Sequence, residues 1–320
     1  ASGTLYFDVA RRAWSMEMLR DLGMNASQVP ACHESPDLVD RLSDSAASLM
    51  GLTAGIPLVA GAGDQAANAI GSGIITPGAV AASLGTSGVI FAASDSFRAS
   101  PDGALHAFCH ALPGRWHLMS VMLSAAGSLR WYLDTLARDT AARANAEGLS
   151  VYELLDRDAA AIQPGCEGLR FVPTLSGERC PIPNPHARGG FHGISVAHTQ
   201  AHFTRAVMEG VAAGMGLCMG LIRQAGITPP EVIASGGGFE SPLWTAMHAN
   251  AFGIPVRRAE TPDSAALGAA ILAAIGTENR AKPSELLSPS TGGSDPIQPT
   301  QLHIWKDLMA DQELLQRNAL

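Results

Sequence analysis

The sequence predicts a mixed α/β fold, in which helices cover the faces of a sheet. Two observations indicate this fold: a β-hairpin pattern at 79–93, and strand and helix patterns that alternate between residues 169 and 274. A hairpin followed by such an alternation is typical of a mixed sheet with helices on its faces. The chain has 320 residues, a length that suits two domains or one large one.

The region 1–77 is predicted to end with a strand that leads into a helix. Ser15 is placed to cap a short helix at 15–22. Further along, the apolar strand 56–60 runs through a glycine-rich turn into a helix of small residues at 65–71. Strand, glycine turn and helix in this order commonly present one side chain at a cleft.

A hairpin opens the next region, which begins at Gly78. Its strands are predicted at 79–84 and 89–93, joined by a turn of glycine and small hydroxyl residues. A third strand is predicted at 116–123, and Ser124 is placed to cap the helix that follows it.

Strands and helices then alternate to the end of the chain. They are a strand at 169–175, a long helix at 199–225, a strand at 232–234, a helix from Ser241, a strand at 254–257 and a helix at 265–274. A linker rich in Pro, Gly and Ser at 283–299 leads to a last amphipathic helix at 302–315.

Composition narrows the class of protein. The net charge of −8 argues against a nucleic-acid partner, because binding a phosphate backbone needs a basic face. The apolar stretch Val207–Ile222 contains Glu209 and is expected to be a buried helix that is too short to span a membrane. The cysteines are scattered and lack a C-x-x-C spacing, which predicts reduced, mostly buried thiols of a cytoplasmic protein without a zinc site. They are Cys32, Cys109, Cys166, Cys180 and Cys218.

The run A-G-A-G-D-Q-A-A-N at 60–68 places Asp64 between the strand and the helix. A carboxylate at this junction can accept the proton of a bound hydroxyl group, and the flanking glycines leave room for a substrate. An aspartate at the start of a helix is equally typical of an N-cap. Both interpretations stay open on this motif alone.

Two further glycine-rich turns are candidates for binding phosphate or a nucleotide. The turn S-L-G-T-S-G at 83–88 exposes N–H groups and a threonine hydroxyl at the hairpin tip, although many hairpin turns look similar. The run A-S-G-G-G-F-E-S at 234–241 allows a ligand to approach the backbone, and Ser241 can cap the next helix. Neither run is a Walker A or a dinucleotide-binding motif.

Two other kinds of site are not favoured. Pro113-Gly114 interrupts any helix that His106, His110 and His117 could share, and no carboxylate lies among them. Core positions and a pocket wall therefore explain these histidines better than a metal site. Ser87 and Ser176 lack the G-x-S-x-G motif of a serine hydrolase.

Three longer runs together resemble one protein family. They are L-S-G-E-R-C-P-I-P-N-P-H-A-R-G-G-F-H-G-I at 175–194, H-F-T-R-A-V-M-E-G at 202–210 and H-A-F-C-H-A-L-P-G-R-W-H-L-M-S at 106–120. The first two resemble the C-terminal signature of the FGGY carbohydrate kinases, and the first and third resemble its xylulokinase branch most. The resemblance extends from about Gly3 to the last helix and corresponds to the C-terminal two-thirds of such a kinase.

The resemblance implies a fold of two ribonuclease H-like domains, as in actin and Hsp70, with a cleft between them. The first domain would be incomplete in this chain: 1–77 would be its C-terminal part, 78–275 the ATP-binding domain, and 276–320 a linker and C-terminal helix. The D-x-G-T-like hairpin with which the family begins, which holds phosphate and Mg²⁺ water ligands, does not occur in the sequence. We therefore expect a preceding segment and little kinase activity from this chain by itself.

The resemblance also implies the site residues. Asp64 matches the family's catalytic base, and its neighbour Gln65 matches a sugar-binding position where xylulokinases usually have Asn. The other matching positions would bind ATP: Gly85, Thr86 and Ser87 of the phosphate turn, Gly127 at the start of a helix, and Gly236, Gly237, Gly238 and Phe239 of an adenosine-binding G-G-G-A motif in which Phe replaces Ala.

The predicted function is the ATP-dependent phosphorylation of a pentulose, D-xylulose first, with ATP and Mg²⁺ as cofactors. A non-catalytic ATP-binding fragment and a kinase for ribulose or glycerol are the alternatives. A small-molecule sugar and ATP are the expected partners, with neither nucleic acid nor membrane, and a homodimer is left open.

Arg205 is the predicted partner of the buried Glu209, four residues later on the long helix.

Overall fold

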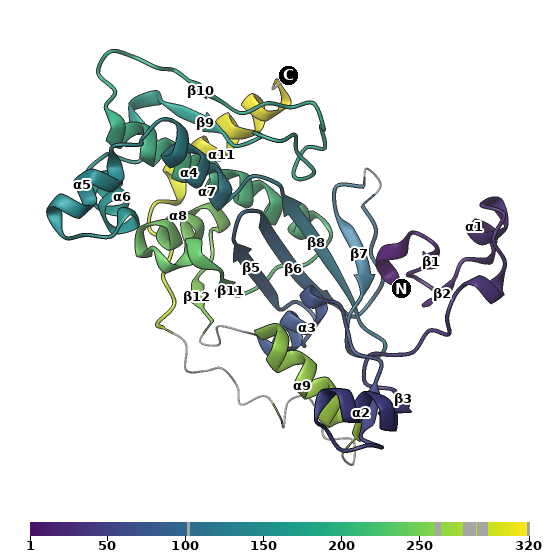
Figure 1. Cartoon of the computed structure of the whole chain (residues 1–320). Helices are drawn as coiled ribbons and strands as arrows, with labels where there is room; N and C mark the ends of the chain where they lie inside the picture. The colour runs from purple at the N-terminus through teal and green to yellow at the C-terminus, as the bar shows by residue number, and fades with distance from the viewer. Residues whose placement is uncertain (101–102, 260–263, 278–285, 287–293, 319–320) are drawn as a thin grey trace.

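The computed structural model describes residues 1–100, 103–259, 264–277, 286 and 294–318. A six-stranded mixed sheet lies at its centre, in the order β12-β11-β5-β6-β8-β7 (Figure 1). Its strands are β5 (Val80–Leu84), β6 (Gly88–Ser94), β7 (His106–Cys109), β8 (Trp116–Met122), β11 (Val232–Ser235) and β12 (Val256–Arg258). The β5, β6, β8 and β7 pairings are antiparallel, whereas β11 runs parallel to β5 and β12. The predicted mixed α/β fold is confirmed.

The predicted hairpin is present, with Leu84 opposite Gly88, so the return strand begins one residue earlier than predicted and the turn is 85–87. Alternate side chains of β5, such as Val80 and Ala82, are buried on the face of the sheet that the long helix covers. On the opposite face, Phe91 packs with Ala69 of a helix from the first region. Successive side chains of a strand point to opposite faces of the sheet, so the strands pack against two separate layers of helices.

The long helix α7 (Gln200–Gln224) covers one face of the sheet and packs against β6 and β8 (Figure 1). Around it lie α4 (Ala126–Thr135), α6 (Val151–Ala160), α8 (Pro242–Phe252) and α11 (Leu302–Arg317). Glycines permit close contact: a Cβ on Gly210 would lie 2.2 Å from the carbonyl oxygen of Phe171. Among the described helices, α7 alone is long and apolar enough to cross a membrane, so the expectation that it is too short to do so was wrong. Its predicted burial is confirmed, since 83% of its most apolar window is buried inside the protein.

The other face of the sheet carries α3 (Asp64–Gly71), which crosses α9 (Ser264–Thr277). The two helices meet at glycines, because a Cβ on Gly71 would lie 1.8 Å from the carbonyl oxygen of Ser264. This crossing joins the first region of the chain to the region that follows it.

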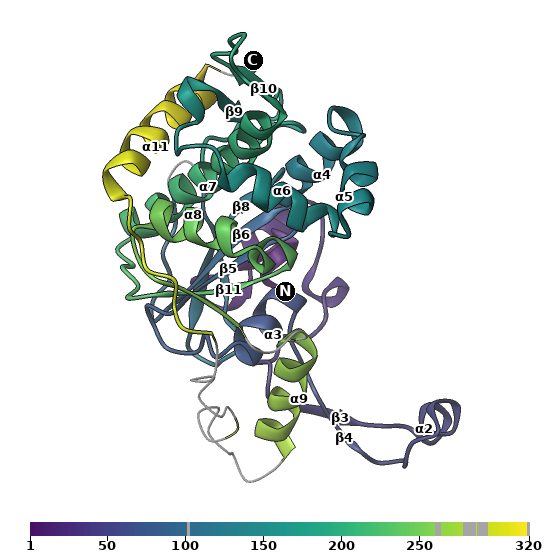
Figure 2. The same ribbon diagram turned by 90° about the vertical axis from the view of Figure 1, so that its left-hand side faces the viewer.

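The first region otherwise consists of short elements. They are β1 (Phe7–Asp8), β2 (Ala13–Trp14), α1 (Met16–Asp21), β3 (Leu38–Arg41), α2 (Asp44–Met50) and β4 (Pro57–Val59). The β3–β4 pair and α2 form an arm that extends away from the sheet (Figure 2). The N-terminal segment lies beside the sheet edge, where Trp116 Nε1 donates to the carbonyl of Val9 at 2.8 Å.

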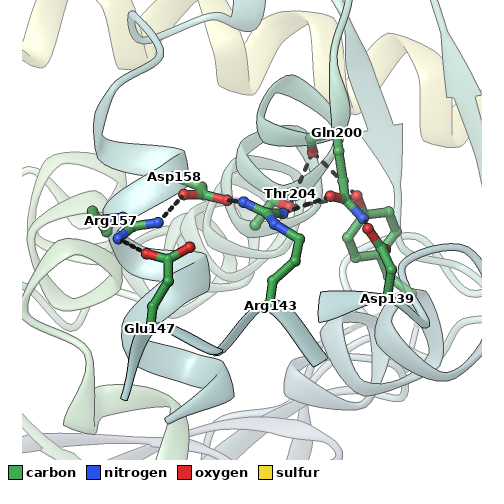
Figure 3. A network of polar contacts seen from close by, with 8 residues as sticks. Asp139, Arg143, Glu147, Arg157, Asp158, Gln200 and Thr204 are labelled. Atoms are coloured by element: carbon green, nitrogen blue, oxygen red, sulfur yellow. Dashed lines mark hydrogen bonds and ion pairs between the residues drawn. The ribbon is translucent and has the colours of Figure 1, made fainter. Parts of the chain in front are cut away.

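A polar network fastens α5 (Thr140–Glu147) and α6 to the start of α7 (Figure 3). Arg143 is its centre and donates to Gln200 Oε1 and to Asp158 Oδ2, both at 2.8 Å. Gln200 Nε2 also donates to Asp139 at 2.9 Å. The network anchors the outer helix pair on the core helix.

The predicted partner of Glu209 is confirmed. Arg205 Nε donates to Glu209 Oε1 at 2.7 Å, and both side chains are buried. The N–H of Gly165 lies 3.0 Å from Glu209 Oε2, so the buried carboxylate also receives a backbone hydrogen bond. The hydrogen bond from Gly165 to Glu209 thus ties α7 to the turn before β9.

Several element boundaries differ from the predictions. Ser124 does not cap α4: the N-cap is Ala125, without a side-chain bond, and Ser124 Oγ contacts Ser176 Oγ at 3.0 Å. The strand predicted at 169–175 is only β9 (Arg170–Val172), which pairs with β10 (Gly190–His192) and ends before Pro173. Of the predicted linker 283–299, residues 283–285 and 287–293 lie outside the described residues.

Candidate functional site

Asp64 is the first residue of α3, and its side chain is exposed. The helix is capped by Gly63, so Asp64 is not the N-cap that the sequence left open. One carboxylate oxygen, Oδ1, accepts the N–H of Gln65 at 2.8 Å. The second oxygen is available to a ligand, and the helix N-terminus favours a negative charge at this position.

A cavity of about 930 Å³ lies in front of Asp64 and Gln65. This volume falls in the range typical of small-molecule sites. Its walls come from the N-terminal segment, from residues 30–37 and 60–66, and from β7 and β8 of the sheet. The cavity therefore lies between the first region of the chain and the edge of the central sheet.

Histidines form part of the wall of this cavity, as predicted from the sequence. His110 and His117 line the cavity, and His117 stacks on Phe91 with ring centroids 4.2 Å apart. Burial lowers the pKa of His110 to about 4 and that of His117 to about 3, so both rings are neutral near pH 7. His106 lies on β7, half-buried, and burial lowers its pKa as well.

The turn 85–87 is fastened to the start of α4. The N–H of Ala126 donates to the Gly85 carbonyl at 2.9 Å, and the N–H groups of Ala125 and Gly127 donate to the Thr86 carbonyl at 2.9 and 3.2 Å. In a planar trans peptide the N–H points opposite to the C=O. The N–H groups of Thr86 and Ser87 therefore point away from the helix, which is the arrangement that an anion-binding turn needs.

The turn 236–238 packs on the last residue of β5. A Cβ on Gly236 would lie 2.8 Å from the Leu84 carbonyl oxygen, and one on Gly238 would lie 2.4 Å from the Leu84 side chain. Gly237, by contrast, has no atom within 4 Å of its Cβ direction and is exposed. Close packing on Leu84 requires glycine at 236 and 238, while the Cβ direction of Gly237 faces open space.

The structure brings the two glycine-rich turns together through Leu84, and Gly127 joins them through Thr86. The side chain of Phe239 is 1% exposed and lies 4.9 Å from the ring of His248. Only its backbone can face a ligand, so the Phe that replaces Ala in the motif does not project a bulky side chain from the turn. Within the described part of the chain, neither turn lines the cavity that contains Asp64.

Glu178 is a buried residue for which no sequence motif predicted a separate role. Its Oε1 accepts the N–H groups of Leu123 at 2.9 Å and of Arg179 at 2.8 Å. Burial raises the pKa of Glu178 to about 7, against the lowering effect of these backbone hydrogen bonds. A charged residue between Gly177 and Cys180-Pro181 was the available signal, but only the tertiary structure shows that it is buried.

Comparison with known proteins identifies the family. The chain matches the C-terminal domain of the FGGY family of carbohydrate kinases over residues 80–277 and the N-terminal domain of that family over residues 1–71. It is 41% identical to a xylulose kinase of Escherichia coli over 288 residues, which are 90% of this chain and 57% of that protein.

Solved structures agree with the sequence matches. A xyloylose kinase from Brucella ovis has a TM-score of 0.86 at 34% identity, over 99% of this chain and 63% of the other. A xylulose kinase from Rhodospirillum rubrum has a TM-score of 0.85 at 28% identity, over 98% of this chain and 62% of the other. The chain thus spans somewhat more than half the length of these relatives and has the actin- and Hsp70-like fold of sugar kinases. It belongs to the FGGY family of carbohydrate kinases.

Proposed function

We propose that the protein containing this chain transfers the γ-phosphoryl group of ATP to a pentulose, with D-xylulose as the first candidate. The observation that carries the proposal is the exposed Asp64 carboxylate, at the start of α3 and at the wall of a cavity of about 930 Å³. The similarity to xylulose kinases at 41% and 34% identity supports the sugar.

In this proposal Asp64 acts as the general base. Its Oδ1 accepts the Gln65 N–H, which leaves Oδ2 to take the proton of the terminal sugar hydroxyl. The hydroxyl oxygen forms a bond to the γ-phosphorus, the bond from that phosphorus to the β-γ bridging oxygen breaks, and ADP leaves with the electron pair. Gln65, at the same wall, is placed to contact other sugar hydroxyls.

In this proposal the nucleotide binds to the paired glycine-rich turns, 85–87 and 236–238. The outward N–H groups of Thr86 and Ser87 would hold phosphate oxygens, and Gly127 fixes the turn from behind. Adenosine would lie against the open face of Gly237. The sugar and nucleotide residues are on separate elements, so catalysis requires the region around α3 and the region around β5 to present them to one cleft.

Mg²⁺ supplies charge neutralisation on the phosphates when it is bound with ATP. Among the described residues, no group of three or more His, Cys, Asp or Glu side chains could hold a metal ion. Protein sites of Mg²⁺ commonly use one or two carboxylates together with substrate phosphates and water. In this proposal the ion arrives with the nucleotide and is held mainly by phosphate oxygens and water. A cytoplasmic location is part of the proposal, since ATP and reduced thiols are found there.

The test is an ADP-release assay on the full-length protein with a panel of D-xylulose, D-ribulose, D-gluconate and glycerol. We expect the highest kcat/KM with D-xylulose. A higher value with another substrate would keep the kinase and change the sugar. ATP binding without turnover on any of the four would favour the non-catalytic alternative.

A further inference from the structure

A chain of hydrogen bonds connects the phosphate turn to Glu178, in a loop far away in the sequence. Ser87 Oγ donates to the Leu123 carbonyl at 3.2 Å. The N–H of the same residue, Leu123, donates to Glu178 Oε1 at 2.9 Å. One peptide group on each side of Leu123 thus joins the turn to a buried carboxyl group.

The segment that Glu178 holds is also the segment that orients the turn. The N–H groups of Ala125 and Gly127 fix the Thr86 carbonyl, and through it the direction of the Ser87 N–H. A second bond holds the same segment, between Ser124 Oγ and Ser176 Oγ at 3.0 Å. The loop 176–178 therefore supports residues 123–127, and these residues support the phosphate turn.

Glu178 is well suited to this role because its own position is fixed. Its side chain is 4% exposed, and its backbone exchanges two hydrogen bonds with Asn184, at 2.8 and 2.9 Å. Gly177 packs so closely that a Cβ would lie 2.6 Å from the Pro185 carbonyl oxygen. A carboxyl group on such a rigid loop positions its partners with little freedom.

We propose that Glu178 is a positioning residue for the nucleotide phosphates: it holds Leu123 and thereby fixes the N–H groups of the 85–87 turn. The proposal rests on the proposed kinase function for the identity of the ligand. A purely structural role is the alternative, in which the loss of Glu178 would lower stability without altering nucleotide binding.

Glu209 provides the matched control. It is also a buried glutamate that accepts a backbone N–H, that of Gly165, but its partners Gly165 and Arg205 take no part in the hydrogen bonds that link Leu123 to the turn. Glu178→Ala and Glu209→Gln should both lower the melting temperature. Only Glu178→Ala should raise the Kd for ATP. The expected increase is about ten-fold, which corresponds to the free energy of about one hydrogen bond.

The experiment measures ATP binding by calorimetry without sugar, together with amide hydrogen exchange over residues 120–130. Glu178→Ala should increase exchange at Leu123, Ala125 and Gly127, and Glu178→Gln should restore both readouts because its Oε1 still accepts the two N–H groups. Unchanged ATP affinity in a folded Glu178→Ala variant overturns the proposal. Equal loss of ATP affinity in Glu209→Gln overturns it as well.

Where Glu178→Ala does not fold, Ser87→Ala tests the same hydrogen-bond chain from its other end and should weaken ATP binding several-fold. Because these measurements need no sugar, they are separate from the test of the proposed reaction. An inactive protein whose ATP affinity falls on Glu178→Ala would refute the reaction and retain the positioning role. An active kinase whose ATP affinity is unaltered by Glu178→Ala would support the reaction and refute the positioning role.

Discussion

Gly71 of α3 and Gly268 of α9 lie against each other's helix backbones. A Cβ on Gly71 would lie 1.8 Å from the carbonyl oxygen of Ser264, and a Cβ on Gly268 would lie 1.8 Å from that of Ala67. No side chain larger than hydrogen fits between the helices without moving them apart. Because Asp64 begins α3, this crossing also sets the position of the proposed base relative to α9.

Gly268→Ala should therefore destabilise the protein, because the clash is with backbone atoms that have little room to move. We expect a loss of about 1–3 kcal/mol in the free energy of unfolding, measured by denaturant titration. Gly220→Ala on α7 is the matched control, since its Cβ would meet nothing within 4 Å. The control should be neutral or more stable by up to about 1 kcal/mol. A Gly268→Ala variant as stable as the control would contradict the close crossing.

In the full-length protein, Asp64→Asn should lower kcat by about 10²–10⁴-fold, the usual effect of removing one general base. The amide still accepts the Gln65 N–H through its oxygen, so the start of α3 should keep its geometry. Steady-state kinetics with ATP and D-xylulose check kcat, and calorimetry checks that the Kd for ATP changes little. Near-normal kcat would mean that Asp64 only begins the helix.

Gly237→Val should weaken ATP binding while the protein remains folded. Its Cβ would enter open space, where we place the adenosine. Gly238→Val is the contrasting variant: its Cβ would lie 2.4 Å from the Leu84 side chain, so it should lower the melting temperature first. A thermal melt and an ATP titration on both variants distinguish the cases. Unaltered ATP affinity in Gly237→Val would remove the adenosine from this turn.

Arg205→Ala should cost about 3–5 kcal/mol of stability, because it leaves Glu209 buried without its charged partner. Arg205→Ala combined with Glu209→Gln should recover part of the loss, since the neutral amide no longer carries an unpaired charge. Denaturant titrations of the two variants and the wild type give the comparison. Equal stability of the single and double variants would show that the pair carries no coupling.

His117 should make the protein less stable in acid. Burial lowers its pKa from 6.5 to about 3. Between these two values the unfolded chain binds a proton that the folded chain does not, so the free energy of unfolding decreases as the pH falls below 6.5. At pH 5 this contribution is about 2 kcal/mol.

His117→Phe tests this dependence, because a phenyl ring can keep the stacking on Phe91. The variant should match the wild type at pH 7.5 and be the more stable of the two at pH 5. Denaturant titrations at both pH values measure the difference. Parallel stability curves for variant and wild type would show that the pKa of His117 is not lowered in the folded protein.

The sequence by itself determined most of the local structure and the family. Strand alternation and the turn Gly85–Gly88 predicted the hairpin, and the apolar, small-residue run predicted α7 to within a residue at each end. The i, i+4 spacing of Arg205 and Glu209 predicted their ion pair. These features depend on periodicity and spacing within one segment, and both can be read directly from the sequence. The division of the chain at residue 77 stays a prediction.

Only the tertiary structure decided which segments meet. Leu84 connects two turns that are about 150 residues apart in the chain. Glu178 accepts a hydrogen bond from Leu123, and nothing in the sequence around Glu178 predicts this contact. Phe239 is likewise buried in the core that the central sheet shares with α7. Such contacts arise from packing between elements distant in sequence, and a pattern read along one segment cannot specify them.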